Sequence, residues 1–174
     1  MPDADSERRQ TVVMKFGGTS VASAERIKHA AQRIVQSKEA GSRVVAVLSA
    51  RGTTTNELMA MAAEVSPRPD PRELDMLLST GERISCALVA MAIHDLGYEA
   101  VSFTGSQAGI VTDDAHGRAK IREIRAQRVV CLLYTSDAAD DSLRVDLAHV
   151  RTERRRERHR RRVRAAAAER RHVA

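Results

Sequence analysis

A lysine and two glycines between a strand-like run and a helical pattern most constrain how this chain folds. Residues 15–20 read Lys-Phe-Gly-Gly-Thr-Ser, after an apolar run at residues 12–14 and before a helical pattern that begins near Ser23. Glycines let consecutive backbone N–H groups converge on an anion, and a helix N-terminus and a lysine add positive charge. The order predicts a phosphate-binding loop, and an ordinary tight turn is the equal alternative on these local features.

The following residues predict a βαβ unit. Apolar side chains recur at helical spacing from residue 24 to residue 35, with Ser23 as the N-cap and Gly41 as the glycine that ends the helix. Residues 44–48 form a continuous β-prone run, which is typical of a strand covered on both faces. Because the two strands are expected to be parallel, the loops after residues 16 and 48 lie at the edge of the sheet where ligands bind.

The pattern continues as far as residue 124. We expect helices over residues 57–65 and 72–96, strands over 100–103 and 110–112, a glycine-bearing loop over 104–109 and a turn over 113–117. The threonines at 53–55 are either capping residues or substrate ligands. Gly81 interrupts the long helical pattern and marks a bend or a close backbone approach. The charged pair after it, Glu82 and Arg83, is either a surface salt pair or a charge presented to a polar ligand.

Composition bounds the class of protein. A chain of 174 residues is long enough for one domain with a core. Its two cysteines, Cys86 and Cys131, give neither a disulfide framework nor metal-ligand spacing. No uninterrupted apolar run is long enough to span a bilayer. We therefore expect a cytoplasmic protein with no membrane partner and no metal ligand of its own.

The net charge of +6 is a property of one part of the chain. Residues 143–174 contain 12 arginines and 4 acidic residues, which is +8, so the remainder carries −2. The part that is expected to fold therefore gives no sign of a polyanionic partner.

Five motifs in order resemble those of aspartate kinase (aspartokinase), in particular the actinobacterial type. They are the hexapeptide at 15–20, Ser-Ala at 49–50, Thr-Asn-Glu-Leu at 55–58, Gly-Glu-Arg-Ile-Ser at 81–85 and Phe-Thr-Gly-Ser-Gln-Ala-Gly at 103–109. The resemblance covers roughly residues 12–129. It implies the amino acid kinase fold, a three-layer α/β/α sandwich with a mainly parallel sheet. It also implies that ATP, with Mg²⁺, phosphorylates L-aspartate to 4-phospho-L-aspartate, the first step toward lysine, threonine and methionine.

The resemblance assigns roles to seven residues, which are Lys15, Gly17, Gly18, Ser20, Ser49, Thr55 and Glu82. It implies that Lys15 is catalytic, on the transferring phosphoryl group, and that Lys15, the two glycines and Ser20 bind ATP. The other three are implied to bind substrate, with Glu82 facing the α-ammonium group of aspartate. This agrees with phosphoryl transfer, which needs positioning and charge neutralisation more than a nucleophile from the protein.

The resemblance ends near residues 129–130. No second glycine-rich nucleotide loop and no regulatory domain follows, so only half of a kinase site is expected, in a chain that is itself inactive. Residues 131–140 resemble a translated sequencing-library adapter, and the arginine-rich residues after them resemble GC-rich DNA read in the wrong frame. We interpret residues 1–11 as a disordered leader, 12–130 as a truncated kinase domain and 131–174 as a non-native tail that is disordered or an isolated helix. The parent enzyme is expected to be oligomeric.

Two alternatives stay open at this point. Another amino acid kinase, such as a glutamate 5-kinase or a uridylate kinase, shares the fold and a similar glycine loop. A nucleic-acid-binding module is the alternative from another class, because arginine runs such as 154–156 and 160–162 bind phosphates non-specifically. Nucleic acid is the disfavoured partner, since no aromatic residues interleave the arginines for base stacking.

Overall fold

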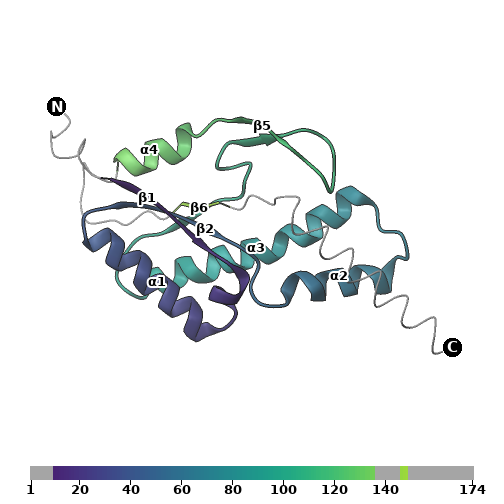
Figure 1. Cartoon of the computed structure of the whole chain (residues 1–174), viewed down its shortest axis with the longest axis horizontal. Coiled ribbons are helices and arrows are strands. Elements are labelled where there is room, and N and C mark those ends of the chain that lie inside the picture. The colour runs from purple at the N-terminus through teal and green to yellow at the C-terminus, as the bar shows by residue number, and fades with distance from the viewer. Residues whose placement is uncertain (1–9, 136–145, 149–174) are drawn as a thin grey trace.

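A parallel sheet forms the centre of the computed structural model, which describes residues 10–135 and 146–148. Its strand order is β1-β2-β6-β3, and each neighbouring pair is parallel. β1 (Thr11–Phe16) pairs with β2 (Arg43–Leu48) so that Phe16 lies opposite Leu48. The carboxyl ends of both strands are therefore level, which confirms the predicted common edge (Figure 1).

The helix between these strands confirms the predicted βαβ unit. α1 (Ala24–Glu39) begins at Ser23, whose side chain accepts the N–H of Arg26 at 3.3 Å. Its buried face consists of Ile27, Ala30, Ala31, Ile34 and Val35. Just after its end Gly41 adopts a φ of +89°, a conformation that favours glycine.

The next two helices form an antiparallel pair. α2 (Thr54–Val65) begins three residues earlier than predicted. Thr53 occupies the N-cap position without a side-chain cap hydrogen bond, and its Oγ1 donates to Oε1 of Glu57 at 2.6 Å. α3 (Pro71–His94) is continuous, so the predicted interruption at Gly81 is wrong as a break, and the glycine has a packing role instead. Figure 1 shows α2 beside the first half of α3, and the second half of α3 with α1 below the sheet.

α3 is also the one helix of the described residues that is long and apolar enough to cross a membrane. The sequence shows no uninterrupted apolar run of this length because Glu82 and Arg83 lie in its middle. Core helices of soluble proteins pass the same test of length and composition. The buried side chains of α3, among them Leu78, Val89 and Ile93, are typical of such a core helix.

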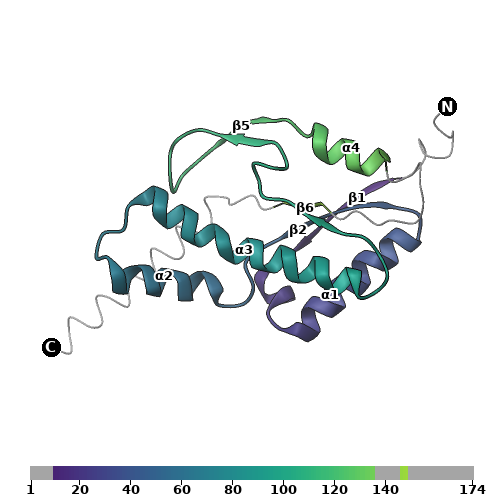
Figure 2. The ribbon, with the colours of Figure 1, turned by 180° about the vertical axis from the view of Figure 1, so that it is seen from behind.

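A third layer lies on the other face of the sheet, as both views show (Figures 1 and 2). It consists of an antiparallel hairpin, β4 (Ile110–Thr112) and β5 (Ile121–Ile124), and of α4 (Gln127–Thr135). The guanidinium of Arg43 lies 4.2 Å from the ring centroid of Tyr134, and that of Arg128 lies 5.0 Å from the ring of Phe103. This layer is incomplete, because Val13 of β1 stays 66% exposed.

The structure differs from the predicted tail at three residues. β6 (Asp146–Ala148) lies between β2 and β3 (Val101–Ser102), whereas the sequence predicts a disordered or helical tail at residues 146–148. A strand in this position satisfies the backbone groups of both neighbours, which favours extended structure there. α4 also continues past residue 130, where the kinase-like part is predicted to end. The rest of the tail and nearly all of the predicted leader lie outside the described residues.

Candidate active site

The glycine turn follows β1 directly. Gly17 precedes a short 3₁₀ helix, η2 (Gly18–Val21), and the N–H of Ser20 donates to the carbonyl of Gly17 at 2.9 Å. Gly18 and Val21 are buried, whereas Ser20 is exposed. One side of the turn therefore packs against the core, and its hydroxyl-bearing side faces outward.

Gly17 has no structural need to be glycine. Its φ of −74° suits any residue, and a Cβ built on it meets no heavy atom within 4 Å. The contrast is Gly109, where φ is +81° and a Cβ would lie 1.9 Å from the carbonyl oxygen of Arg125. A glycine with open space around its missing side chain allows a ligand to approach the backbone closely. The geometry at Gly17 therefore favours the phosphate loop over the ordinary tight turn.

Backbone hydrogen bonds join this turn to the loop after β2. The N–H of Ser49 donates to the carbonyl of Phe16 at 3.1 Å, and that of Gly52 donates to the carbonyl of Gly18 at 2.9 Å. Ser49 and Thr55, the latter in the first turn of α2, are half-buried. Two of the predicted substrate-binding residues thus belong to a segment that is held directly against the glycine turn.

α3 reaches the same loop through Gly81. A Cβ at this position would lie 3.0 Å from the Cβ of Ala50 and 3.3 Å from Cγ2 of Thr54. Glycine therefore lets the α3 backbone pack against the residues that follow β2, which confirms the close approach that the sequence predicts. The next residue, Glu82, enters the interior at this contact.

Glu82 is buried, with 4% of its surface exposed. The alternative of a surface salt pair with Arg83 is therefore wrong: the Arg83 side chain is exposed and donates to Oγ of Ser79 at 2.8 Å. Burial, and next the negative charge of Glu82, raise the pKa of the Cys86 thiol one turn further on to about 12. A buried carboxylate beside the loop after β2 suits a cationic group such as an ammonium.

Lys15, like Ser20, is exposed. It alternates with half-buried Met14 and buried Phe16 along β1, so its side chain leaves the sheet on the opposite face. It stands one residue before the end of the strand and two before the glycine turn. An exposed ammonium at this end of the strand is available to an anionic ligand.

The loop after β3 is closed by its own side chains. The N–H of Thr104 donates to Oε1 of Gln107 at 2.9 Å, and the hydroxyls of Thr104 and Ser106 lie 3.1 Å apart. Ala108 is buried, and the carbonyl of Gly109 accepts the N–H of Arg125 at 2.7 Å. The glycine at 109 therefore serves the fold of the hairpin that follows rather than a ligand.

The β4–β5 hairpin contains a basic pocket that none of the predicted motifs indicated. A pocket of about 460 Å³ is lined by Asp113, Ala115, Arg118, Lys120, Ile121 and Arg122. The signal was the spacing of the three basic residues, every second position, which places them on one side of an extended segment. The carboxylate of Asp113 accepts the N–H groups of Lys120 at 3.0 Å and Ala115 at 3.3 Å, and the Lys120 bond is the main reason that the pKa of Asp113 lies below its usual value.

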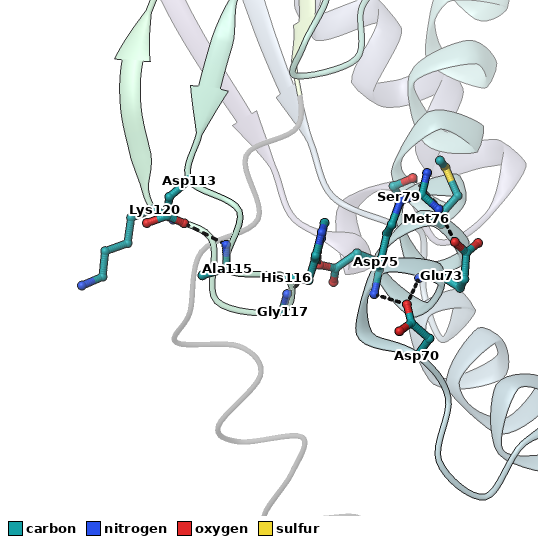
Figure 3. A network of polar contacts seen from close by, with 11 residues as sticks. Asp70, Glu73, Asp75, Met76, Ser79, Asp113, Ala115, His116, Gly117 and Lys120 are labelled. Carbon is teal, nitrogen blue, oxygen red and sulfur yellow. Dashed lines mark hydrogen bonds and ion pairs between the residues drawn. The ribbon is translucent and has the colours of Figure 1, made fainter.

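α3 holds the tip of this hairpin. The Oδ2 of Asp75 accepts the N–H of Gly117 at 2.6 Å and lies 3.8 Å from Nδ1 of the exposed His116 (Figure 3). In the part of the chain that the structure describes, no group of three or more His, Cys, Asp or Glu side chains could hold a metal ion.

The family model described as "Amino acid kinase family" matches residues 10–154. With its parallel sheet between helical layers and its glycine turn at the carboxyl edge, the chain belongs to the amino acid kinase family. Within that family it is similar to aspartokinases. It is 59% identical to the aspartokinase of Mycolicibacterium smegmatis and 53% identical to that of Geobacillus stearothermophilus, over 118 residues in each case.

These comparisons also show how much of each relative the chain represents. The 118 residues are 68% of this chain, but 28% and 29% of the two aspartokinases. Aspartate kinase from Synechocystis has a similar structure, with a TM-score of 0.64 and 38% identity over 80% of this chain and 22% of that one. A carbamate kinase from Giardia lamblia bound to AMP-PNP, 16% identical with a TM-score of 0.55 over 81% of this chain and 56% of that one, shares the fold alone. The resemblance to aspartate kinase and the predicted fold class are confirmed.

Proposed function

We propose that this chain carries the substrate and phosphate side of an aspartate kinase site, which transfers the terminal phosphoryl group of ATP to L-aspartate to give 4-phospho-L-aspartate. The observation that carries the proposal is the open space at Gly17, in a turn hydrogen-bonded to the loop of Ser49 and Thr55. Sequence identity of 59% to an aspartokinase over 118 residues supports the choice of substrate. The reaction begins the synthesis of lysine, threonine and methionine, in the cytoplasm.

Each residue has a role that its surroundings support. The backbone of Gly17 and Gly18, with the hydroxyl of Ser20, binds ATP phosphates, and Lys15 neutralises charge on the transferring phosphoryl group. Ser49 and Thr55 bind aspartate, and the buried carboxylate of Glu82 binds its ammonium group. The β-carboxylate of aspartate is itself the nucleophile, so the protein supplies position and charge rather than a reacting atom.

The partners follow from this reaction. ATP and L-aspartate are the substrates, and Mg²⁺ supplies further charge neutralisation when it is bound with the nucleotide phosphates. We assign no protein ligand to the magnesium ion. The working enzyme is expected to be an oligomer, and neither a membrane nor a nucleic acid is part of the proposed function.

Ligand titration of the ¹⁵N-labelled chain tests the proposal. MgATP is expected to shift the amide signals of residues 15–20, and L-aspartate those of Ser49, Thr55 and Glu82. L-glutamate and UMP, the substrates of the alternative kinases, should leave the same signals in place. Shifts with either of these and none with aspartate would assign the site to another amino acid kinase, and shifts only with duplex DNA would favour the nucleic-acid-binding alternative.

A further inference from the structure

We propose that Arg26 and Arg51 are positioning residues that hold the backbone of the glycine turn in the orientation that binds phosphate. This inference rests on the proposed function of the turn. Neither residue is among those that the sequence assigns to the site. Both come from outside the turn: Arg26 lies in the first turn of α1, and Arg51 lies in the loop after β2.

The two arginines donate to carbonyl oxygens of the same short segment. Nη2 of Arg51 lies 3.0 Å from the carbonyl oxygen of Ala22, and Nη1 of Arg26 lies 2.5 Å from that of Thr19. Both bonds are charge-assisted, which makes each of them stronger than a bond between neutral groups. The guanidinium of Arg51 is also half-buried and crosses from one ligand loop to the other.

Backbone donors hold two further carbonyls of the turn. The Gly17 carbonyl accepts the N–H of Ser20, and the Gly18 carbonyl accepts the N–H of Gly52, both at 2.9 Å. Four carbonyls between residues 17 and 22 are thus held by donors. The two backbone bonds close the turn, and the two arginine bonds fix the direction of the peptides at its far end.

A hydrogen bond that fixes the direction of a carbonyl group also fixes the direction of the N–H group of the next residue. In a trans peptide the C=O and the following N–H point in opposite directions, and the described residues contain no cis peptide. A carbonyl oxygen that faces an anion repels it, whereas an N–H group attracts it. The N–H group that follows the Thr19 carbonyl is that of Ser20, which closes the turn on the Gly17 carbonyl. Arg26 therefore pre-organises the turn by holding it closed rather than by aiming a ligand-binding amide directly, and the charges of both arginines add to the positive field around the turn.

Arg51 also couples the loop after β2 to the glycine turn. It stands between Ser49 and Thr55 in the sequence and is followed by Gly52, so two successive residues bond this loop to the glycine turn. The phosphate-binding and aspartate-binding segments should therefore move as one unit, as transfer between two bound substrates requires.

The test uses the full 174-residue chain, ¹⁵N-labelled and titrated with inorganic tripolyphosphate. We expect Arg51→Met and Arg26→Met each to weaken binding at the glycine-turn amides about tenfold. Arg33→Met removes the same charge from an exposed position of α1 and serves as the matched control, with an unchanged affinity. Arg51→Lys keeps the charge without the planar fork and should bind with intermediate affinity.

Hydrogen exchange of the Ser20 and Gly52 amides, without ligand, reports the order of the turn independently. Faster exchange in the Arg51 and Arg26 variants, with little change in the thermal midpoint, is expected. Affinities equal to that of the Arg33 variant together with unchanged exchange would overturn the inference. If the unaltered chain bound no tripolyphosphate, the phosphate role of the turn would fail, and exchange alone would decide whether the arginines hold it.

Discussion

At the scale of single residues, three glycines that look alike in the sequence have different causes in the structure. Gly109 has a positive φ and no room for a side chain, and Gly81 allows α3 to approach Ala50 and Thr54. Gly17 has neither constraint, because its φ is ordinary and the space beside it is open. Only the glycine that the fold does not require points to a ligand.

Gly17→Ala should therefore weaken phosphate binding without changing the stability of the fold. The added methyl group meets no protein atom, so the free energy of unfolding should change by less than about 0.5 kcal/mol. The same methyl group occupies the space beside the turn and should weaken tripolyphosphate binding about tenfold or more. Denaturant unfolding and the ¹⁵N titration measure the two effects.

Gly109→Ala is the contrasting variant, because its Cβ would overlap the backbone of Arg125. It should destabilise the protein clearly, whatever happens to binding. Undiminished tripolyphosphate affinity in Gly17→Ala would show that the ligand does not approach this glycine.

The buried thiol of Cys86 should make stability fall at alkaline pH. Its pKa is about 12 in the folded protein, against an ordinary value of 9.0. The thiol therefore contributes fully to stability below pH 9, and this contribution is lost as the pH rises through about 12. Cys86→Ala should reduce the loss of stability above pH 9, as measured by urea unfolding at neutral and alkaline pH.

Cys131→Ala is the matched control, since Cys131 is exposed. It should follow the alkaline profile of the unaltered chain. Equal profiles for all three proteins would mean that ionisation of Cys86 does not oppose folding.

At the scale of helices and strands, the hairpin turn after β4 depends on one carboxylate. Asp113 accepts the N–H groups of Ala115 and Lys120, and the latter bond is the main cause of its lowered pKa. The contribution of the Asp113 carboxylate to stability is therefore complete above its ordinary pKa of 3.8. It is lost as the pH falls through the lower pKa that this group has in the folded protein. Asp113→Ala should speed amide exchange at both positions near neutral pH, and protonation of Asp113 in acid should lower the protection factors of the same amides in the unaltered chain.

The neighbouring Asp114 gives the control for that experiment. Its side chain is exposed, so Asp114→Ala should leave exchange at residues 115 and 120 unchanged. Equally slow exchange in the Asp113 and Asp114 variants would mean that the turn holds its shape without the carboxylate.

These elements also show what the sequence could predict. Periodicity and capping located β1, α1 and β2 well, because their signals are local. Local signals could not show that Glu82 is buried, since the cause is the contact of Gly81 with a loop some thirty residues earlier in the chain. Arg51 carries no motif, and its bond to Ala22 joins residues 29 positions apart.

At the scale of the whole molecule, the strands of the sheet show how much of the chain belongs to the fold. Comparison with aspartokinases accounts for 118 residues, whereas the family model extends to residue 154. β6 lies within the residues that the family model matches and fills the position between β2 and β3. A strand of three residues with non-local, parallel partners has too little local signal for sequence analysis to find it.

Leu147→Pro tests whether this strand supports the sheet. Leu147 pairs with Ala46 on one side and Ser102 on the other, and proline removes its N–H from the ladder. Loss of a ladder hydrogen bond should lower the free energy of unfolding by about 1 kcal/mol. Leu147→Val keeps this N–H group and is the control, which should lose less stability. Urea unfolding measures the free energy of unfolding of both variants. Equal values would mean that residues 146–148 do not support the sheet and belong to the tail that the sequence predicts.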